Sequence, residues 1–364
     1  MVEPLMVLLE LRGEYLAAER LYAHTAAQLE DQNAPNQASE IILARVLTGQ
    51  SWFCFRLAQF EQGRALSARA FSLLQKHDAW QHTAYPLLIG GANEFGAGNL
   101  AAAREMTASS VEVYRRSQDA FGIAGALNNL GQITTALGEF DAAENYLRAS
   151  LEVARRAGIK MLQCSALENL GALEFQRGEL VQAQRDLEEC LTLARETGDQ
   201  YETATTQNSL ARVLVARGET QTAAALLQDA ENTWRKLGDR WSLANTLLAA
   251  AQVQRALNQP LPAEGLYWSA LETAHAINAT TMVLNVLAGI AELRAARGEM
   301  DFARAWCAVI VQHPAAEAAT RERAMHCFDE FTAPLDADAV QALRTRAAQR
   351  DLRTAVAQLL DERA

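Results

Sequence analysis

Apolar residues recur at helical spacing along most of this 364-residue chain, and alanine and leucine dominate among them. In ALNNLGQITTALGEFDAAENYL, residues 126–147, leucines and small residues on each side of Gly138 form one apolar stripe per helix. Such stripes predict amphipathic α-helices, and the glycine between them predicts a turn. Alternations of Val, Ile and Thr are too few to build strands, so the pattern predicts an all-α protein without a sheet.

The same pattern returns after forty residues, in ALENLGALEFQRGELVQAQRDL. Two columns of the repeat hold only small residues: one lies seven residues before the turn position, and one lies five residues after it. Small residues allow the backbones of two antiparallel helices to cross closely. The sequence therefore predicts repeated helical hairpins. Their turn positions are Ala58, Gly98, Gly138, Gly178, Gly218, Asn258 and Gly298.

In the unit around Gly138, we expect a first helix over about 121–137 and a second over about 141–157. Gly138 suits a left-handed C-cap, and asparagine at Asn258 can adopt the same conformation. Because a single hairpin cannot bury its apolar stripe alone, the units are expected to stack on one another. The second helices are expected to end in the same way, at Gly158, Gly198 and Gly238.

The segment FGIAGALNNLGQITTALGEFDAAENYLRASLEVARRAGIK, residues 121–160, resembles a long tetratricopeptide repeat (TPR). The resemblance rests on a small residue in the first helix, an alanine twelve residues later, then leucine and another small residue. It is strong from Leu100 to Arg297 and implies a TPR-like α–α superhelix, a right-handed solenoid of helical hairpins. Repeats of this type occur in kinesin light chains, spindle-orientation adaptors, peptide-sensing Rap proteins and the sensor regions of STAND-type regulatory NTPases.

Three regions are expected along the chain. Residues 1–40 should form a truncated N-terminal TPR hairpin and a linker, because only about a dozen residues precede a turn at Gly13. Residues 41–314 should form an array of seven hairpins with a forty-residue period. Residues 315–364 should add a final helix and C-terminal capping helices, with Asp336 or Asp338 and Asp351 at their starts. A chain that opens inside a repeat looks like a part of a longer protein.

Charge and motifs favour binding over catalysis. The net charge of −11 makes nucleic acid and anionic membranes poor direct partners. No P-loop, HExxH, GxSxG or EF-hand pattern occurs, and the six histidines share no metal-ligand spacing. The five cysteines lie among alanine and leucine in helical patterns, where they are expected to act as small apolar residues. We therefore expect no enzymatic activity, no cofactor and no metal site.

The chain carries no signal-like N-terminus and no apolar run of membrane-spanning length. A cytoplasmic location is therefore expected.

The TPR resemblance places partners on the concave face, which is lined by the first helix of each hairpin. Half a turn away from the expected core stripe, these helices carry amides and isolated arginines, which suit hydrogen bonds to a peptide backbone or a polar ligand. The N-terminal units add aromatic residues beside arginines, which suit a stacked or amphipathic ligand. Alternatively, these side chains complete the packing between repeats. The candidates are Arg45, Trp52, Phe55, Arg56, Tyr85, Asn128, Asn129, Gln132, Asn169, Asn208, Arg212, Asn245, Gln252 and Arg255.

Two functional hypotheses fit these sequence features. The first is the sensor region of a larger STAND-type (MalT-, AfsR- or LuxR-like) signalling or transcription-regulating NTPase, which would bind a protein, a peptide or a small inducer. This resemblance rests on PLDADAVQALRTRAAQRDLRTAVAQLLDERA, residues 334–364, which is similar to the C-termini of LuxR- and AfsR-like regulators, and it implies an NTPase domain upstream. The alternative is a free-standing adaptor that binds a peptide or helix in its concave groove. An enzyme ranks below both, because no catalytic constellation assembles.

Overall fold

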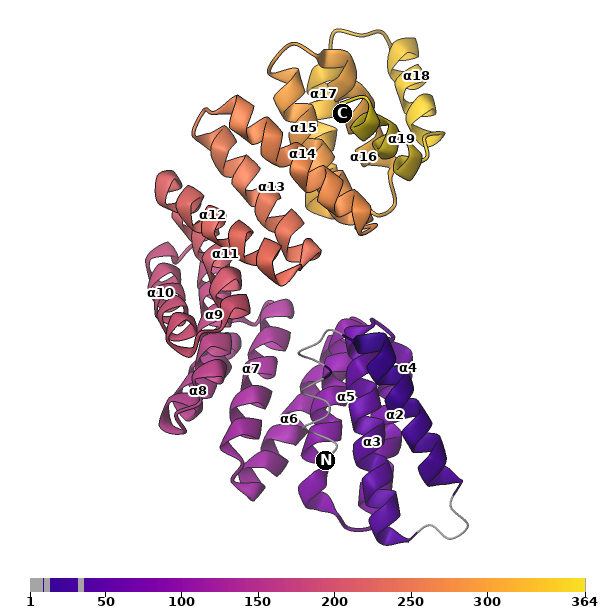
Figure 1. Ribbon diagram of the computed structural model, residues 1–364, viewed down its shortest axis with the longest axis vertical. Helices are drawn as coiled ribbons and strands as arrows, with labels where there is room; N and C mark the ends of the chain where they lie inside the picture. Colours follow the sequence, from indigo (N-terminus) through magenta and orange to yellow (C-terminus); the bar gives the residue numbers. More distant parts are fainter. Residues whose placement is uncertain (1–8, 10–13, 32–35, 364) are drawn as a thin grey trace. The chain divides into compact units, whose positions relative to one another are not determined.

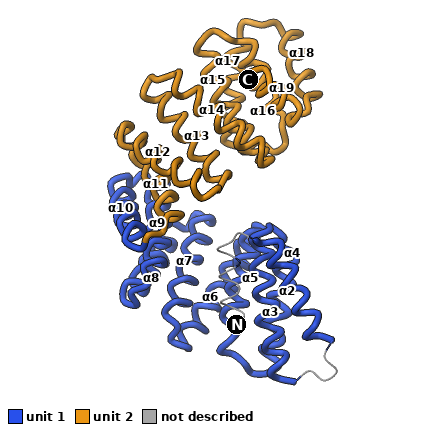
Figure 2. The backbone as a smooth tube through the Cα atoms, viewed as in Figure 1, with its two compact units in different colours: residues 1–197 blue, residues 198–364 orange. Residues whose placement is uncertain are grey.

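The computed structural model describes residue 9 and residues 14–31 and 36–363. Within these ranges the chain forms α-helices, one short 3₁₀ helix and no strand (Figure 1), so the all-α prediction is confirmed. The helices gather into two compact units, Met1–Thr197 and Gly198–Ala364 (Figure 2). None of the described helices combines the length and the apolar character that crossing a bilayer requires.

Unit 1 is a stack of antiparallel helical hairpins in which each helix packs against its sequence neighbours. We call the first helix of a hairpin the A helix and the second the B helix. The A helices of unit 1 are α3 (Gln37–Arg56), α5 (Ala84–Gly96), α7 (Ala120–Ala136) and α9 (Lys160–Arg177). The B helices are α4 (Phe60–Lys76), α6 (Leu100–Ser117), α8 (Phe140–Arg156) and α10 (Leu180–Thr197). The 3₁₀ helix η1 (Trp80–His82) joins α4 to α5, and α2 (Tyr15–Glu30) packs on α3.

Unit 2 continues the same construction and then changes it. Its A helices are α11 (Gln200–Ala216), α13 (Arg240–Ala256) and α15 (Thr280–Ala295). Its B helices are α12 (Thr220–Leu237), α14 (Pro260–Ala276) and α16 (Met300–Gln312). Three further helices follow, of which α17 and α18 pack on α16 and α19 packs on α14. These are α17 (Ala318–Thr332), α18 (Ala337–Ala348) and α19 (Leu352–Asp361).

The turns repeat one backbone conformation. All seven predicted turn positions are left-handed, with φ between 56° and 85°, and this includes Ala58 and Asn258. The ends of the B helices repeat it, and the prediction for Gly158, Gly198 and Gly238 is confirmed with φ of 68°, 71° and 74°. A left-handed residue reverses the chain within one turn, so each helix can return along its neighbour.

The small-residue columns lie at the helix crossings, as the sequence predicts. A Cβ atom built on Gly131 of α7 would lie 2.4 Å from Leu147 Cγ of α8. A Cβ atom on Gly171 of α9 would lie 2.6 Å from Leu187 Cγ of α10. In these hairpins the glycine backbone of the A helix therefore contacts the leucine side chain of the B helix directly, and no space remains for a methyl group on the glycine.

Helix boundaries and caps agree with the sequence pattern. Helices α7 and α8 begin and end within one residue of the expected 121–137 and 141–157. Asp336 accepts a hydrogen bond from the N–H of Ala339 at 2.8 Å, and Asp351 accepts one from the N–H of Thr354 at 2.9 Å. Both acids therefore cap helices as predicted. The truncated hairpin expected in residues 1–40 lies partly outside the described residues.

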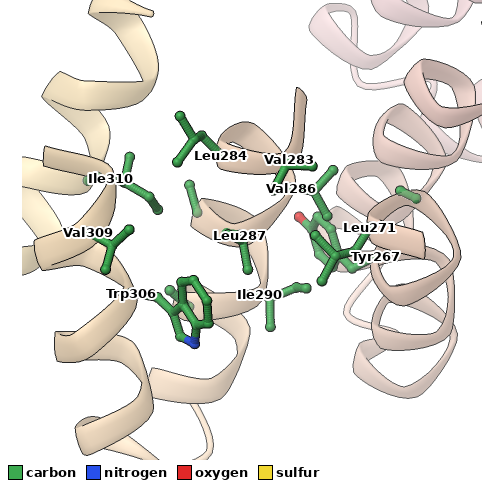
Figure 3. Close-up of a cluster of buried hydrophobic side chains, with 14 of the residues drawn as sticks. Tyr267, Leu271, Val283, Leu284, Val286, Leu287, Ile290, Trp306, Val309 and Ile310 are labelled. Carbon is green, nitrogen blue, oxygen red and sulfur yellow. The ribbon is translucent and has the colours of Figure 1, made fainter. Parts of the chain in front are cut away.

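The largest continuous core among the described residues lies in unit 2, where α13 to α19 enclose it. Figure 3 shows Tyr267 and Leu271 of α14 facing Val286 of α15, with Trp306 of α16 on the other side. Burial of this apolar surface supplies the main driving force for stacking. The cysteines contribute to the cores as predicted, because four of the five are buried: Cys54, Cys164, Cys190 and Cys307.

Candidate functional site

The side of the A helices that carries the predicted site residues, from Arg45 on α3 to Arg255 on α13, is called here the A-face, and most of these residues are half-buried. In unit 1, three of them meet in one hydrogen-bonded chain. The Asn169 side-chain amide of α9 donates to Asn128 Oδ1 of α7 at 3.0 Å, and Gln132 Nε2 of α7 donates to Asn169 Oδ1 at 3.2 Å. Asn128 is only 7% exposed, whereas Gln132 faces solvent. These amides therefore tie neighbouring A helices together and leave Gln132 at the outer edge.

The predicted aromatic residues of α3 pack on one another. The Trp52 and Phe55 ring centroids lie 5.6 Å apart, and Phe55 lies 6.0 Å from Phe60 of α4. Arg56 donates to the Tyr15 hydroxyl at 2.6 Å, and its guanidinium carbon lies 4.6 Å from the centre of that ring. This end of the A-face is therefore a packed contact between α2, α3 and α4, which favours the packing interpretation for its aromatic residues.

In unit 2, further predicted residues link A helices laterally. Asn208 Nδ2 of α11 donates to the buried Thr246 Oγ1 of α13 at 2.8 Å. Arg255 of α13 pairs with Glu292 of α15, and Arg323 Nε of α17 lies 3.0 Å from the same carboxylate. Arg212 is exposed on α11. The remaining candidates outside the pocket described next are half-buried on their helices: Arg45, Tyr85, Asn129 and Gln252.

One predicted residue, Asn245, lines an open pocket on the A-face of unit 2. This A-face pocket has a volume of about 480 Å³ and also includes Trp241 of α13, Asn285 of α15 and Glu317 at the start of α17. Trp241 is 58% exposed. Apolar and hydroxyl side chains complete its lining: Leu248, Ala279, Thr280, Thr281 and Met282.

The polar groups of the A-face pocket are available to a ligand. Among the described residues, neither the side-chain amides of Asn245 and Asn285 nor the Glu317 carboxylate has a hydrogen-bond or ion-pair partner. This distinguishes them from Asn128, Asn169 and Asn208, whose amides already bond to neighbouring helices. A side-chain amide offers both donors and an acceptor, and an exposed indole offers an apolar platform.

Trp241 belongs to a periodic column that the sequence prediction missed. The first turns of four successive A helices, α7, α9, α11 and α13, each expose one large apolar side chain at forty-residue spacing. These side chains are Phe121 (54% exposed), Met161 (56%), Tyr201 (56%) and Trp241 (58%). The repeat register would have found them, because a large apolar residue repeated at a position outside the core stripe indicates a surface used for binding.

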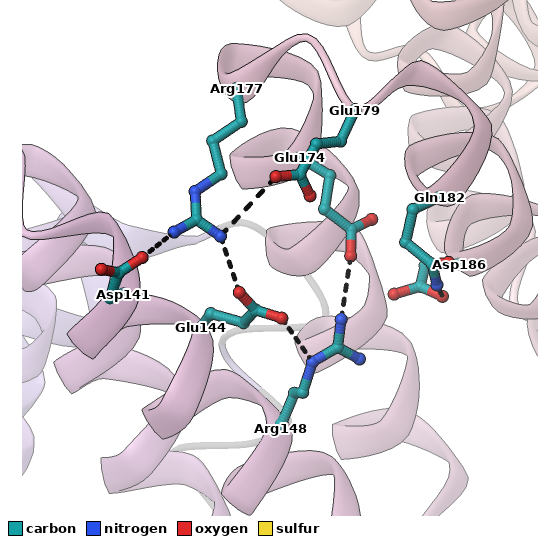
Figure 4. Close-up of polar contacts among 8 residues, drawn as sticks. All are labelled: Asp141, Glu144, Arg148, Glu174, Arg177, Glu179, Gln182 and Asp186. Atoms are coloured by element: carbon teal, nitrogen blue, oxygen red, sulfur yellow. Dashed lines mark hydrogen bonds and ion pairs between the residues drawn. The ribbon is translucent and has the colours of Figure 1, made fainter.

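A charged cluster with the buried carboxyl of Glu174 and the half-exposed Arg148 joins α8, α9 and α10 in unit 1 (Figure 4). Arg148 lies 3.3 Å from Glu174 Oε1 and 2.8 Å from Glu144, and Arg177 lies 2.6 Å from Glu144. Burial, with the neighbouring Asp186 carboxylate as the second cause, raises the pKa of Glu174 to about 8. A raised pKa can mark a catalytic acid. Here the Glu174 side chain is only 1% exposed, and its contact with Arg148 joins α9 to α8.

Comparison with protein families identifies the repeat. A family model described as tetratricopeptide repeat matches residues 162–236, and a second model with the same description matches residues 123–157. No curated protein sequence matches this chain at a significant level.

Solved structures share the fold at low sequence identity. A Rap protein complexed with competence and sporulation factor aligns with a TM-score of 0.62 and 15% identity, over 99% of this chain and 97% of that chain. The Rap conjugation gene regulator of plasmid pLS20, in complex with the Phr* peptide, aligns with a TM-score of 0.57 and 16% identity, over 84% and 82%.

A STAND protein from Pyrococcus horikoshii, described as having a tetratricopeptide repeat sensor, aligns with a TM-score of 0.63 and 12% identity. The alignment covers 95% of this chain and 54% of that chain. Residues 123–157 and 162–236 therefore match the tetratricopeptide repeat, and the chain shares the fold of this STAND protein over 95% of its own length.

Proposed function

We propose that this chain is a non-catalytic scaffold whose A-face binds a peptide or an extended segment of a protein. The observation that carries the proposal is the A-face pocket, in which two unpaired amides lie beside an exposed indole. The fold likeness to Rap proteins, two of which are described in complex with a peptide or signalling factor, supports the same ligand class. A soluble, cytoplasmic setting without direct nucleic-acid or membrane contact suits the net charge of −11.

The amides and the indole of the A-face pocket have different roles in the proposed binding. Asn245 and Asn285 lie at the same position of adjacent A helices, forty residues apart, so their amides can bond to successive main-chain groups of an extended ligand. Trp241 receives an apolar side chain of that ligand. Because α13 and α15 are packed helices, the backbone positions that carry the two amides are fixed before binding, which limits the entropy lost on association.

We further propose that the array is the sensor region of a larger STAND-type signalling or transcription-regulating NTPase. In such a protein, a peptide, a protein or a small inducer bound to the array would shift an NTPase domain between two states through unequal affinity for them. The fold likeness to the Pyrococcus horikoshii protein supports this role.

A free-standing peptide-binding adaptor is the second candidate. The observation in its favour is the Rap alignment, which covers 97% of that solved chain, so an array of this extent makes up nearly all of it. The two roles share the same A-face and differ in what the gene encodes upstream. A P-loop motif in the full-length reading frame supports the sensor role, and its absence supports the adaptor.

Replacing Trp241 and Asn245 together by alanine should weaken peptide binding at least about tenfold, because each contact is expected to contribute on the order of 1 kcal/mol. The probe is a dodecapeptide selected from a random displayed library against the wild-type chain, and the readout is its dissociation constant by isothermal titration calorimetry. Since Trp241 and Asn245 are exposed, the melting temperature should change little.

The matched control carries Leu261→Ala and Gln221→Ala, which remove one exposed apolar side chain and one exposed amide from the B helices α14 and α12. This control should bind the dodecapeptide as the wild type does. Equal loss in both variants, or failure to select any peptide, would contradict the proposed function.

A further inference from the structure

A second pocket of unit 2 collects basic side chains from segments far apart in the sequence. It has a volume of about 330 Å³ and lies where the α14–α15 turn, the end of α16 and the α18–α19 turn meet (helices labelled in Figure 1). His275 comes from the last turn of α14, His313 follows α16, and Arg350 and Arg353 flank the start of α19. We call it the basic pocket.

The charge of the basic pocket is opposite to that of the chain. Among the described residues, neither Arg350 nor Arg353 forms an ion pair within 4 Å, although Arg353 acts on the Asp351 carboxylate at longer range. The acidic residue of the lining is Asp351, and its hydrogen bonds with Thr354 keep its pKa below the ordinary value. Two arginines and one ionised aspartate leave the lining with a net formal charge of +1 before either histidine is protonated. A positive cavity on a chain of net charge −11 indicates a ligand of negative charge.

Two contacts hold these cationic and donor groups in place. The Arg350 guanidinium carbon lies 5.0 Å from the Trp306 ring centroid, within the range of a cation–π contact. The backbone N–H of Ala315 donates to His313 Nδ1 at 3.1 Å, so the neutral imidazole carries its proton on Nε2. His313 Nε2 is therefore a hydrogen-bond donor toward a ligand.

The remaining lining adds donors and an apolar floor. Helix α15 begins at Thr280 without a side-chain cap, so its first backbone N–H groups contribute positive potential beside the Thr280 hydroxyl. The floor is formed by Val283 and Val356, both buried. Oxygen-rich and apolar parts of one small molecule would each find a matching surface here.

We propose that the basic pocket binds a small phosphate monoester. The fork of a guanidinium matches the oxygens of a phosphate, and Arg350 and Arg353 supply two such forks beside the His313 and Thr280 donors. The volume is at the lower end of the roughly 300–1,000 Å³ range of small-molecule sites, which leaves room for a short carbon chain over the valine floor. The two pockets share the lining residue Thr280, but the arginines and His313 that carry this proposal do not line the A-face pocket.

The test is isothermal titration of the full chain at constant ionic strength with two probes, inorganic phosphate and glycerol 3-phosphate. The expected dissociation constant for glycerol 3-phosphate is about 1 mM or below, and inorganic phosphate should bind more weakly. The double variant Arg350→Gln, Arg353→Gln should lose at least about tenfold in affinity for glycerol 3-phosphate. The single variant Arg353→Gln keeps the Arg350–Trp306 contact and should show a measurable loss without a change in folding.

The matched control is Arg240→Gln with Arg346→Gln, which removes the same charge from exposed positions of α13 and α18. This control should bind glycerol 3-phosphate as the wild type does. Equal affinity for the two probes would overturn the monoester assignment. An equal loss in control and test variants, or no binding by either probe, would overturn the site itself.

Discussion

Replacing Gly131 by alanine should lower the free energy of unfolding by about 1–3 kcal/mol, the usual cost of overpacking a close contact. The added Cβ would lie 2.4 Å from both Cγ and Cδ2 of Leu147, and Leu147 is itself fully buried. Leu147 therefore has no open space to move into, and the α7–α8 crossing must widen. Urea unfolding followed by circular dichroism measures the change.

The matched control is Gly125→Ala in the same helix. No atom lies within 4 Å of the Cβ that this substitution adds. Alanine restricts the unfolded chain and favours helix, so the free energy of unfolding should rise by about 0.5–1 kcal/mol. Opposite signs at two glycines of α7 would follow from the crossing geometry alone. The same sign at both positions would contradict the assignment of Gly131 to the hairpin contact.

Raising the pH from about 5 to about 8 should destabilise unit 1 through Glu174. The pKa of this carboxyl is about 8 in the folded chain, against an ordinary value of 4.5. Between these values the folded state holds a proton that the unfolded state has released, so stability falls as pH rises. Burial also raises the pKa of Asp186, which acts in the same direction. Each kcal/mol lost lowers the melting temperature by roughly 2–4 °C in a domain of this size.

The variant Glu174→Gln isolates this contribution, because glutamine stays neutral at every pH. Its melting temperature should match the wild type near pH 5 and exceed it near pH 8. Glu105→Gln, at an exposed position of α6, serves as the control and should follow the wild-type curve. A constant difference between Glu174→Gln and the wild type across this range would show that Glu174 is ionised in the folded state.

The forty-residue repeat makes the fold predictable from the sequence, because each turn and each helix crossing accepts only a few residue types. The position of Gly138 needs a left-handed backbone, and the position of Gly131 holds a small residue, and both requirements recur every forty residues. The register breaks after α16, where His313 leaves the helix with extended backbone. Beyond that residue, helix caps such as Asp336 and Asp351 can still be predicted from the sequence. The packing of α17 to α19 on α14 and α16 cannot be predicted in this way.

The candidate binding site is harder to predict from the sequence than the fold. Periodicity places Asn128, Asn208 and Asn245 on A helices, but it does not show which amides already have partners. Asn128 and Asn208 bond to side chains of the next A helix, and those contacts depend on side-chain conformation across two helices. Trp241 was readable from its column, whereas Glu317 joins the A-face pocket from outside the register.

The basic pocket could not be predicted from the sequence at all, because tertiary packing alone brings its residues together. His275 and Arg350 are 75 positions apart and meet only because α19 packs on α14. No spacing rule connects a residue within the repeats to one in the C-terminal helices. Sequence alone gives each of these side chains as an unremarkable surface group.

Photo-crosslinking from single positions tests directly whether the A-face is the binding surface. A photoreactive phenylalanine analogue is placed at Trp241 on α13, or at the 74% exposed Leu261 on the B helix α14, and the selected dodecapeptide is added. We expect the peptide to be captured from position 241 and not from position 261, with excess unlabelled peptide abolishing the capture. Capture from position 261 alone would contradict it, because the ligand would then lie on the B helices.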